Sequence, residues 1–105
     1  MRTMEPAIIS VWTTLIDDQR GTLLLEMHPT HGPFLHLDLR QWGMDVAHSL
    51  HDGFTTMKRT LKACGHPYVN VIINEGDEKL YRFETFFGFK EIARKDGLIY
   101  MRQET

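Results

Sequence analysis

The hydrophobic and polar positions divide the chain into segments of two different periods. Three apolar segments come first, and polar residues with glycine or proline separate them. They are rich in β-branched and aromatic residues or alternate strictly, as Leu35, Leu37 and Leu39 do. Both patterns predict β-strands, and their succession indicates an antiparallel meander. The predicted strands cover residues 7–14, 22–27 and 34–39.

The period then changes to that of an α-helix. Six apolar residues recur at spacings of three and four: Val46, Leu50, Phe54, Met57, Leu61 and Cys64. This spacing places all six on one helix face, so we expect Cys64 to belong to the core. Gly65 and Pro67 indicate where the helix ends. Asp45 and Ser49 are alternative caps for its start.

The C-terminal part predicts a buried strand, a shorter helix and a hairpin. Residues 68–73 contain little polarity, which is typical of a central strand buried on both faces. Asp77 can cap a helix that carries Leu80, Phe83 and Phe87 on one face and ends at Gly88. The dipeptide Asp96-Gly97 joins apolar segments at 89–94 and 98–102, which predicts a hairpin.

The order β-β-β-α-β-α-β-β predicts an α+β fold: a mixed, mainly antiparallel sheet with two helices. At 105 residues the chain is long enough for one core, so we expect a single domain over residues 1–105. Its 12 Lys and Arg against 14 Asp and Glu give a net charge of −2, which argues against a nucleic-acid partner. No apolar run has the roughly 18 residues of a membrane helix. The N-terminus lacks a signal-peptide pattern. We therefore expect a cytoplasmic protein without a membrane partner.

Histidine and cysteine add little candidate chemistry. The sequence has six histidines, among them the pairs His28 with His31 and His48 with His51, but spacing defines no third ligand. A catalytic zinc site usually needs three protein ligands, so we expect no metal. The single cysteine excludes an intrachain disulfide. We expect Trp42, which precedes the long helix, to fold over the core.

Two segments carry a family resemblance. Residues 82–92 read Arg-Phe-Glu-Thr-Phe-Phe-Gly-Phe-Lys-Glu-Ile, and residues 98–102 read Leu-Ile-Tyr-Met-Arg. They resemble the C-terminal signature of the GCN5-related N-acetyltransferase (GNAT) family, in which a helix closes on aromatic-Gly-Phe and the last strand ends in an aromatic-Met-basic run. The order of elements resembles the family over residues 7–104. Within the family, the chain is similar to small acetyltransferase-like proteins of tailed phages, some of them virion components.

The resemblance implies an acyl-coenzyme A site. In the family, acyl-coenzyme A lies where two strands splay apart, and unpaired backbone groups bind its pantetheine arm. A glycine-containing loop at the start of the long helix binds the pyrophosphate. Carried to this chain, the backbone of Leu37 and Leu39 would hold the thioester arm of acetyl-coenzyme A. Arg40 and Gly43 would lie at the pyrophosphate.

The resemblance also indicates candidate catalytic residues. Family members commonly have a tyrosine four residues before the glycine of Gly-Phe, where it protonates the leaving thiolate. This chain has Glu84 at that position, and Tyr81 lies three residues earlier. Asp38 and Glu26 are the strand carboxylates available as a general base for the attacking amine.

Two hypotheses about function follow. The first is a GNAT-like N-acetyltransferase that transfers an acetyl group from acetyl-coenzyme A to an amine. The second is a non-catalytic protein of this fold with a structural or interaction role, encoded by a phage and virion-associated or host-directed. The second is favoured by Asp45, which stands where the phosphate loop should have a small residue, and by the lack of room for two helices of the family. The surface those helices would cover predicts self-association or a protein partner.

Overall fold

Six strands and two helices make up residues 9–105, the part of the chain that the computed structural model describes. In chain order they are β1 (Val11–Asp18), β2 (Gly21–His28), β3 (Gly32–Leu39), α1 (Met44–Ala63), β4 (Tyr68–Asn74), α2 (Glu78–Phe86), β5 (Lys90–Lys95) and β6 (Leu98–Glu104). This confirms the predicted order. The first strand differs from the predicted range of 7–14, because it begins at Val11 and continues to Asp18. The predicted residues before Ile9 lie outside the described range.

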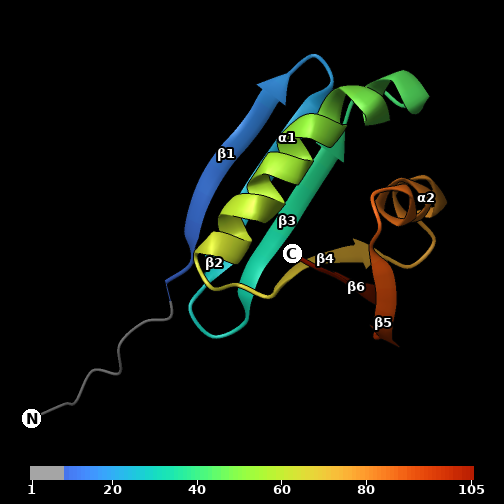
Figure 1. Ribbon diagram of the computed structural model, residues 1–105. Coiled ribbons are helices and arrows are strands. Elements are labelled where there is room, and N and C mark those ends of the chain that lie inside the picture. The colour runs from blue at the N-terminus through green and yellow to red at the C-terminus, as the bar shows by residue number, and fades with distance from the viewer. Residues whose placement is uncertain (1–8) are drawn as a thin grey trace, which may run out of the picture.

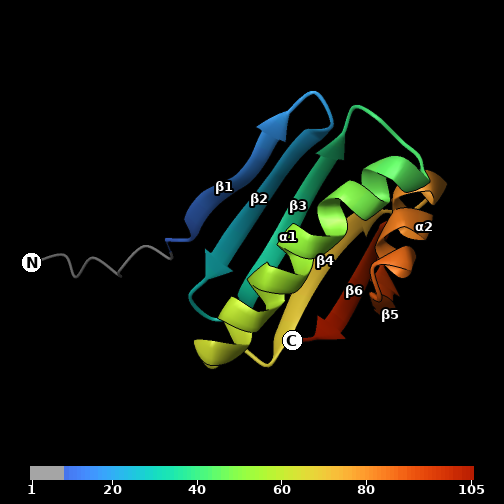
Figure 2. The ribbon, with the colours of Figure 1, turned by 45° about the horizontal axis from the view of Figure 1, so that its top comes forward.

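The strands form one sheet in the order β1-β2-β3-β4-β6-β5. Every neighbouring pair is antiparallel except β3 and β4, which are parallel. Both helices lie on the same face of this sheet, with α1 across its middle and α2 near β6 (Figures 1 and 2). The predicted fold class, a mixed and mainly antiparallel sheet with two helices, is confirmed. In residues 9–105, no helix is long and apolar enough to cross a membrane.

Two clusters of buried side chains lie between the helices and the sheet. The larger one joins α1 to β4 and β6 and includes Val69, Val71 and Met101, all at most 2% exposed. The smaller one lies at the start of α1, where it meets α2 and the end of β3. Its buried members are Leu39, Ala47, Leu50 and Phe83. The aromatic pair Phe54 and Phe87, with ring centroids 5.2 Å apart, connects the two helices.

The ends of α1 differ from the sequence predictions. Its N-cap is Gly43, at φ 126°, and no side chain caps it. Asp45 therefore lies inside the first turn, and Ser49 lies within the helix, where its hydroxyl donates to the Val46 carbonyl at 2.7 Å. Cys64 is exposed rather than part of the core, because the helix ends at Ala63 and the apolar face does not continue past it. The predicted end itself is confirmed by Gly65, at φ 88°.

Local chemistry sets the boundaries of α2 and of the last hairpin as predicted. The Asp77 carboxylate accepts a hydrogen bond from the Leu80 amide at 3.2 Å, which caps the helix. The Phe89 amide returns to the Glu84 carbonyl at 3.1 Å around Gly88, which closes its other end. Asp96 and Gly97 both have positive φ, as a type I′ hairpin turn requires.

Strand β4 is central but is not buried on both faces. Val69, Val71 and Ile73 point to the helices and are buried, whereas Tyr68 and Ile72 on the other face are 42% and 39% exposed. Among the residues described, no element covers this second face. The prediction that the strand is buried on both faces is therefore wrong.

Candidate functional site

Strands β3 and β4 separate after a short contact. They pair only at Phe34 with Asn70 and at Leu35 with Val71. Beyond these positions β3 follows β2 and β4 follows β6, so the two halves of the sheet diverge (Figure 1). Within residues 9–105, the backbone of β3 from residue 36 to residue 39 therefore has no strand partner on the side that faces β4.

Side chains from both helices fill the opening between these strands on the helix-covered face. The smaller core cluster lies here, with Leu37 packed against it. Trp42, in the loop before α1, meets Phe83 edge-on with ring centroids 6.1 Å apart and stays 41% exposed. The prediction that Trp42 folds over the core is confirmed only in part, because the ring contacts Phe83 but the side chain is exposed.

Glu84 is the one ionisable side chain buried in this region. It is 4% exposed and borders a cavity of about 20 Å³, the size of one water molecule, together with Leu37, Leu50 and Phe83. Burial raises the pKa of its carboxyl group to about 8, and no charge or hydrogen bond from a described residue opposes this. At neutral pH the group is therefore mostly protonated and can donate a proton.

The other predicted catalytic residues do not join Glu84. Tyr81 is half-buried and lines a separate depression next to Arg94 and Ile99. Asp38 is exposed on the open face of β3, because side chains alternate along the strand and its neighbours Leu37 and Leu39 face the helices. Leu37 is the predicted binding residue that shares the cavity with Glu84.

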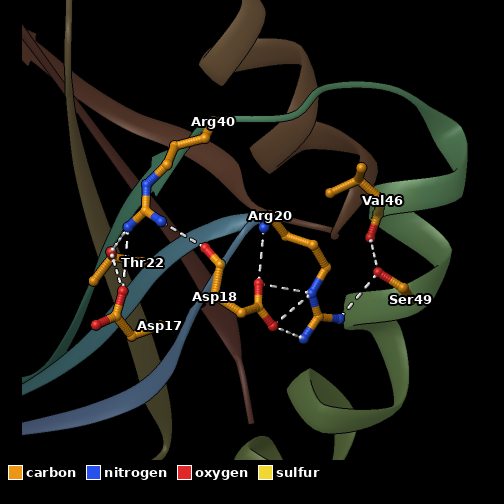
Figure 3. A network of polar contacts seen from close by, with 7 residues as sticks. All are labelled: Asp17, Asp18, Arg20, Thr22, Arg40, Val46 and Ser49. Carbon is orange, nitrogen blue, oxygen red and sulfur yellow. Dashed lines mark hydrogen bonds and ion pairs between the residues drawn. The ribbon is translucent and has the colours of Figure 1, made fainter.

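Arg40 holds the end of β3 to the hairpin of β1 and β2. Its guanidinium donates to the Asp18 carbonyl at 2.6 Å and to the Thr22 hydroxyl at 2.7 Å, and it pairs with the Asp17 carboxylate at 3.2 Å (Figure 3). The family resemblance implies a position for this side chain at a pyrophosphate. In the structure its donors are instead directed at the hairpin.

A second arginine completes this network. Arg20 forms a two-pronged ion pair with Asp18, with its shortest contact at 2.7 Å, and donates to the Ser49 hydroxyl on α1 at 3.2 Å (Figure 3). These hydrogen bonds lower the pKa of Asp18 below its usual range. The network thus fixes the hairpin against the start of α1.

The start of α1 offers backbone donors. The amides of its first turn have no side-chain cap, and open space surrounds the position that a side chain of Gly43 would occupy. The Asp45 carboxylate lies in the same turn. An anion at this helix start would therefore meet the backbone amides together with one negative charge.

A polar pair lies on the open face of the sheet. One member, Glu26, was identified from the sequence, but its partner His36 was not. The Glu26 carboxylate contacts His36 at 2.8 Å and accepts a hydrogen bond from the Ser10 hydroxyl at 2.6 Å. The bond from Ser10 is the main cause of the lowered pKa of Glu26. The ring of Trp12 lies 4.6 Å from that of His36. Alternation along β2 and β3 would place Glu26 and His36 on one face, but their pairing depends on strand register.

Comparison with known proteins bears on the fold alone. No protein-family model matches the chain. No curated protein sequence matches it either. Among solved structures, the chain is similar to a domain from Methanocaldococcus jannaschii DSM 2661, with a TM-score of 0.61 and 12% sequence identity. The match covers 81% of this chain and 56% of that one, so the chain spans about half the length of this neighbour.

Proposed function

We propose that this protein is a GNAT-like N-acetyltransferase, which transfers an acetyl group from acetyl-coenzyme A to an amine. The observation that carries the proposal is a buried, protonated Glu84 beside a pair of parallel strands that diverge after two residue pairs. The GNAT-like order of elements and the likeness of residues 82–102 to the family signature support it. Glu84 and the diverging strands belong to the part of the fold where the family binds its thioester.

The residues at this opening fit the pantetheine arm of acetyl-coenzyme A better than they fit its pyrophosphate. The β3 backbone at residues 37–39 faces the opening without a strand partner, so it can exchange hydrogen bonds with an amide-containing arm. The α1 amides after Gly43 would hold a pyrophosphate, against the repulsion of Asp45, which is roughly 1 kcal/mol at 4 Å in water. Arg40 contributes little here because its donors already serve Asp18 and Thr22.

In the proposed reaction, Glu84 supplies the proton that the leaving group needs. Bound acetyl-coenzyme A would supply an activated thioester, and transfer would exchange its carbon–sulfur bond for a bond from the acyl carbon to the amine nitrogen. Glu84 donates its proton to the departing sulfur, and its pKa of about 8 lies close to the usual thiol value of about 8.5. The proton of the attacking amine would pass to water, because Asp38 and Glu26 lie on the opposite face of the sheet from Glu84.

A second candidate function is a non-catalytic interaction module, virion-associated or host-directed. It is favoured by two observations at the same site: the cavity beside Glu84 measures only about 20 Å³, and Arg40 is engaged with the hairpin. A protein of this type would keep the fold without binding acetyl-coenzyme A.

Calorimetric titration separates the two candidates. We expect acetyl-coenzyme A to bind, and the acyl-pantetheine arm alone to bind more strongly than ADP, because the β3 backbone fits better than the start of α1. If acetyl-coenzyme A gives no heat of binding at millimolar concentration, the acetyltransferase function is excluded. The non-catalytic interaction module is then the candidate that is kept.

Turnover tests the role of Glu84. With a panel of small amines and peptides as acceptors, release of free thiol should fall by about a hundredfold or more in Glu84→Gln. Binding of acetyl-coenzyme A should be retained in this variant. The matched control is Glu78→Gln, on the same helix but 80% exposed, which should react as the wild type does. Equal turnover in both variants would remove Glu84 from the mechanism.

A further inference from the structure

Strand β1 is an unprotected edge of the sheet. Among the described residues it pairs only with β2, so its outer backbone groups have no strand partner. Residues 11–16 read Val-Trp-Thr-Thr-Leu-Ile, which contain no charge, proline or glycine. Natural edge strands usually carry such residues because they prevent pairing with another chain.

The opposite edge shows that protection. Strand β5 reads Lys-Glu-Ile-Ala-Arg-Lys, so four of its six residues are charged. Two of them, Glu91 and Arg94, form an ion pair at 2.6 Å. The same sheet thus has one edge that discourages pairing and one that does not.

Exposed apolar side chains concentrate on and just before β1. Among residues 9–105, ten large hydrophobic side chains are exposed, and four of these lie within residues 9–15. They are Ile9, Val11, Trp12 and Leu15, at 73%, 62%, 52% and 39% exposure. Because successive residues alternate between the two faces of the sheet, these apolar groups stand on both faces at its β1 edge.

An apolar groove runs along the helix-covered side of β1. It has a volume of about 330 Å³ and lies between the β1–β2 hairpin and α1. Its walls include Leu15, Leu25, Phe54 and Met57. A strand added at the β1 edge would therefore lie next to this apolar groove and extend the sheet beneath it.

We propose that the partner at this edge is a second copy of the chain, whose β1 pairs antiparallel with β1 across a twofold axis. One strand then supplies both sides of the interface, as a symmetric dimer requires. The charges select this orientation. A parallel pair would bring the Asp17 and Asp18 residues of both copies together, whereas an antiparallel pair places them at opposite ends. The uncharged segments then face each other, and the bulge at Leu15 limits regular pairing to residues 11–14.

Light scattering combined with size-exclusion chromatography tests the dimer. The mass of the wild-type protein should rise from monomer toward dimer as its concentration increases from micromolar to millimolar. The double variant Val11→Lys/Thr13→Lys should raise the dimer dissociation constant more than about tenfold, because a lysine on an edge strand opposes pairing. The matched control is Ile92→Lys on β5, at 54% exposure, which should dimerise as the wild type does.

Hydrogen exchange identifies the surface. In the wild type, β1 amides should exchange more slowly at high concentration, while β5 amides should not change. This readout needs no variant, so the proposal remains testable if a substitution prevents folding. A wild-type protein that stays monomeric at millimolar concentration overturns the proposal. A dimer whose β1 exchange is independent of concentration overturns it as well, because another surface would then hold the copies together.

Discussion

Replacing Glu84 by glutamine should change how stability depends on pH. The carboxyl group is 4% exposed, and its pKa is raised from 4.5 to about 8 by burial. Between these values the unfolded chain releases the proton while the folded protein keeps it. The unfolding free energy therefore falls as pH rises through this range. Glutamine has nearly the same shape and cannot ionise, so it removes this dependence.

The expected size of the effect is large for a chain of this length. Each pH unit between the two pKa values lowers the unfolding free energy by about 1.4 kcal/mol. Ionisation of Glu84 should therefore remove about 3 kcal/mol between pH 4 and pH 7, and about 5 kcal/mol by pH 9. A domain of this size typically has about 5–15 kcal/mol in total. The wild-type protein should thus be markedly weaker in mild alkali, and Glu84→Gln should not share this weakness.

Urea unfolding at several pH values, followed by circular dichroism, measures the difference. The two proteins should be similar near pH 4.5 and should separate progressively up to about pH 8. Glu78→Gln, exposed on the same helix, should follow the wild type throughout. Below pH 4.5 both should weaken together, because the lowered pKa values of Asp18 and Glu26 make their ionised forms stabilising and acid removes them. Parallel curves for wild type and Glu84→Gln above pH 5 would refute the reasoning.

Further predictions concern the scaffold, and thermal or urea unfolding measures each. Gly21→Ala should destabilise by more than about 2 kcal/mol, because a Cβ there would collide with the Asp38 carbonyl and φ is 147°; an unchanged midpoint would contradict this. Gly53→Ala, inside α1 with open space around it, should instead stabilise by about 0.5–1 kcal/mol. Asp77→Ala should cost about 1 kcal/mol through loss of the α2 cap, and no loss would mean that the cap is redundant. Met101→Ala, from 1% exposure, should cost about 2–5 kcal/mol, and a smaller loss would indicate that the core collapses around the gap.

Local chemistry made much of the fold predictable. Three predicted features each depend on a few adjacent residues, and all three are confirmed. They are the N-cap at Asp77, the helix end at Gly88 and the hairpin turn at Asp96-Gly97. Period and residue type were sufficient for the long helix and for most strands, but the first strand was predicted over residues 7–14 and lies at Val11–Asp18. Period failed at Cys64, because periodicity does not show where a helix stops contacting the sheet.

The site depended on contacts between distant segments, and these were harder to predict. Arg40 was expected at a pyrophosphate, but its hydrogen-bond partners belong to a hairpin that lies 18 to 23 residues earlier in the chain. The pairing of Glu26 with His36 likewise requires the register of β2 against β3. One signal for the burial of Glu84 was present in the sequence. Together with Leu80, Phe83 and Phe87 it completes the spacing i, i+3, i+4, i+7, in which it is the one charged member.

That charged member, Glu84, bears on the choice between the two proposed functions. A module that only needed this fold would be more stable at neutral pH with an apolar residue at position 84, since a buried carboxyl weakens the domain wherever it ionises. Local conflicts of this kind, in which a residue disagrees with the burial of its position, are expected at functional sites. Glu84 lies beside the opening between β3 and β4 and faces the cavity shared with Leu37. In the proposed acyl transfer, a proton donor at this place would protonate the leaving sulfur, whereas the proposed interaction module gives Glu84 no corresponding role.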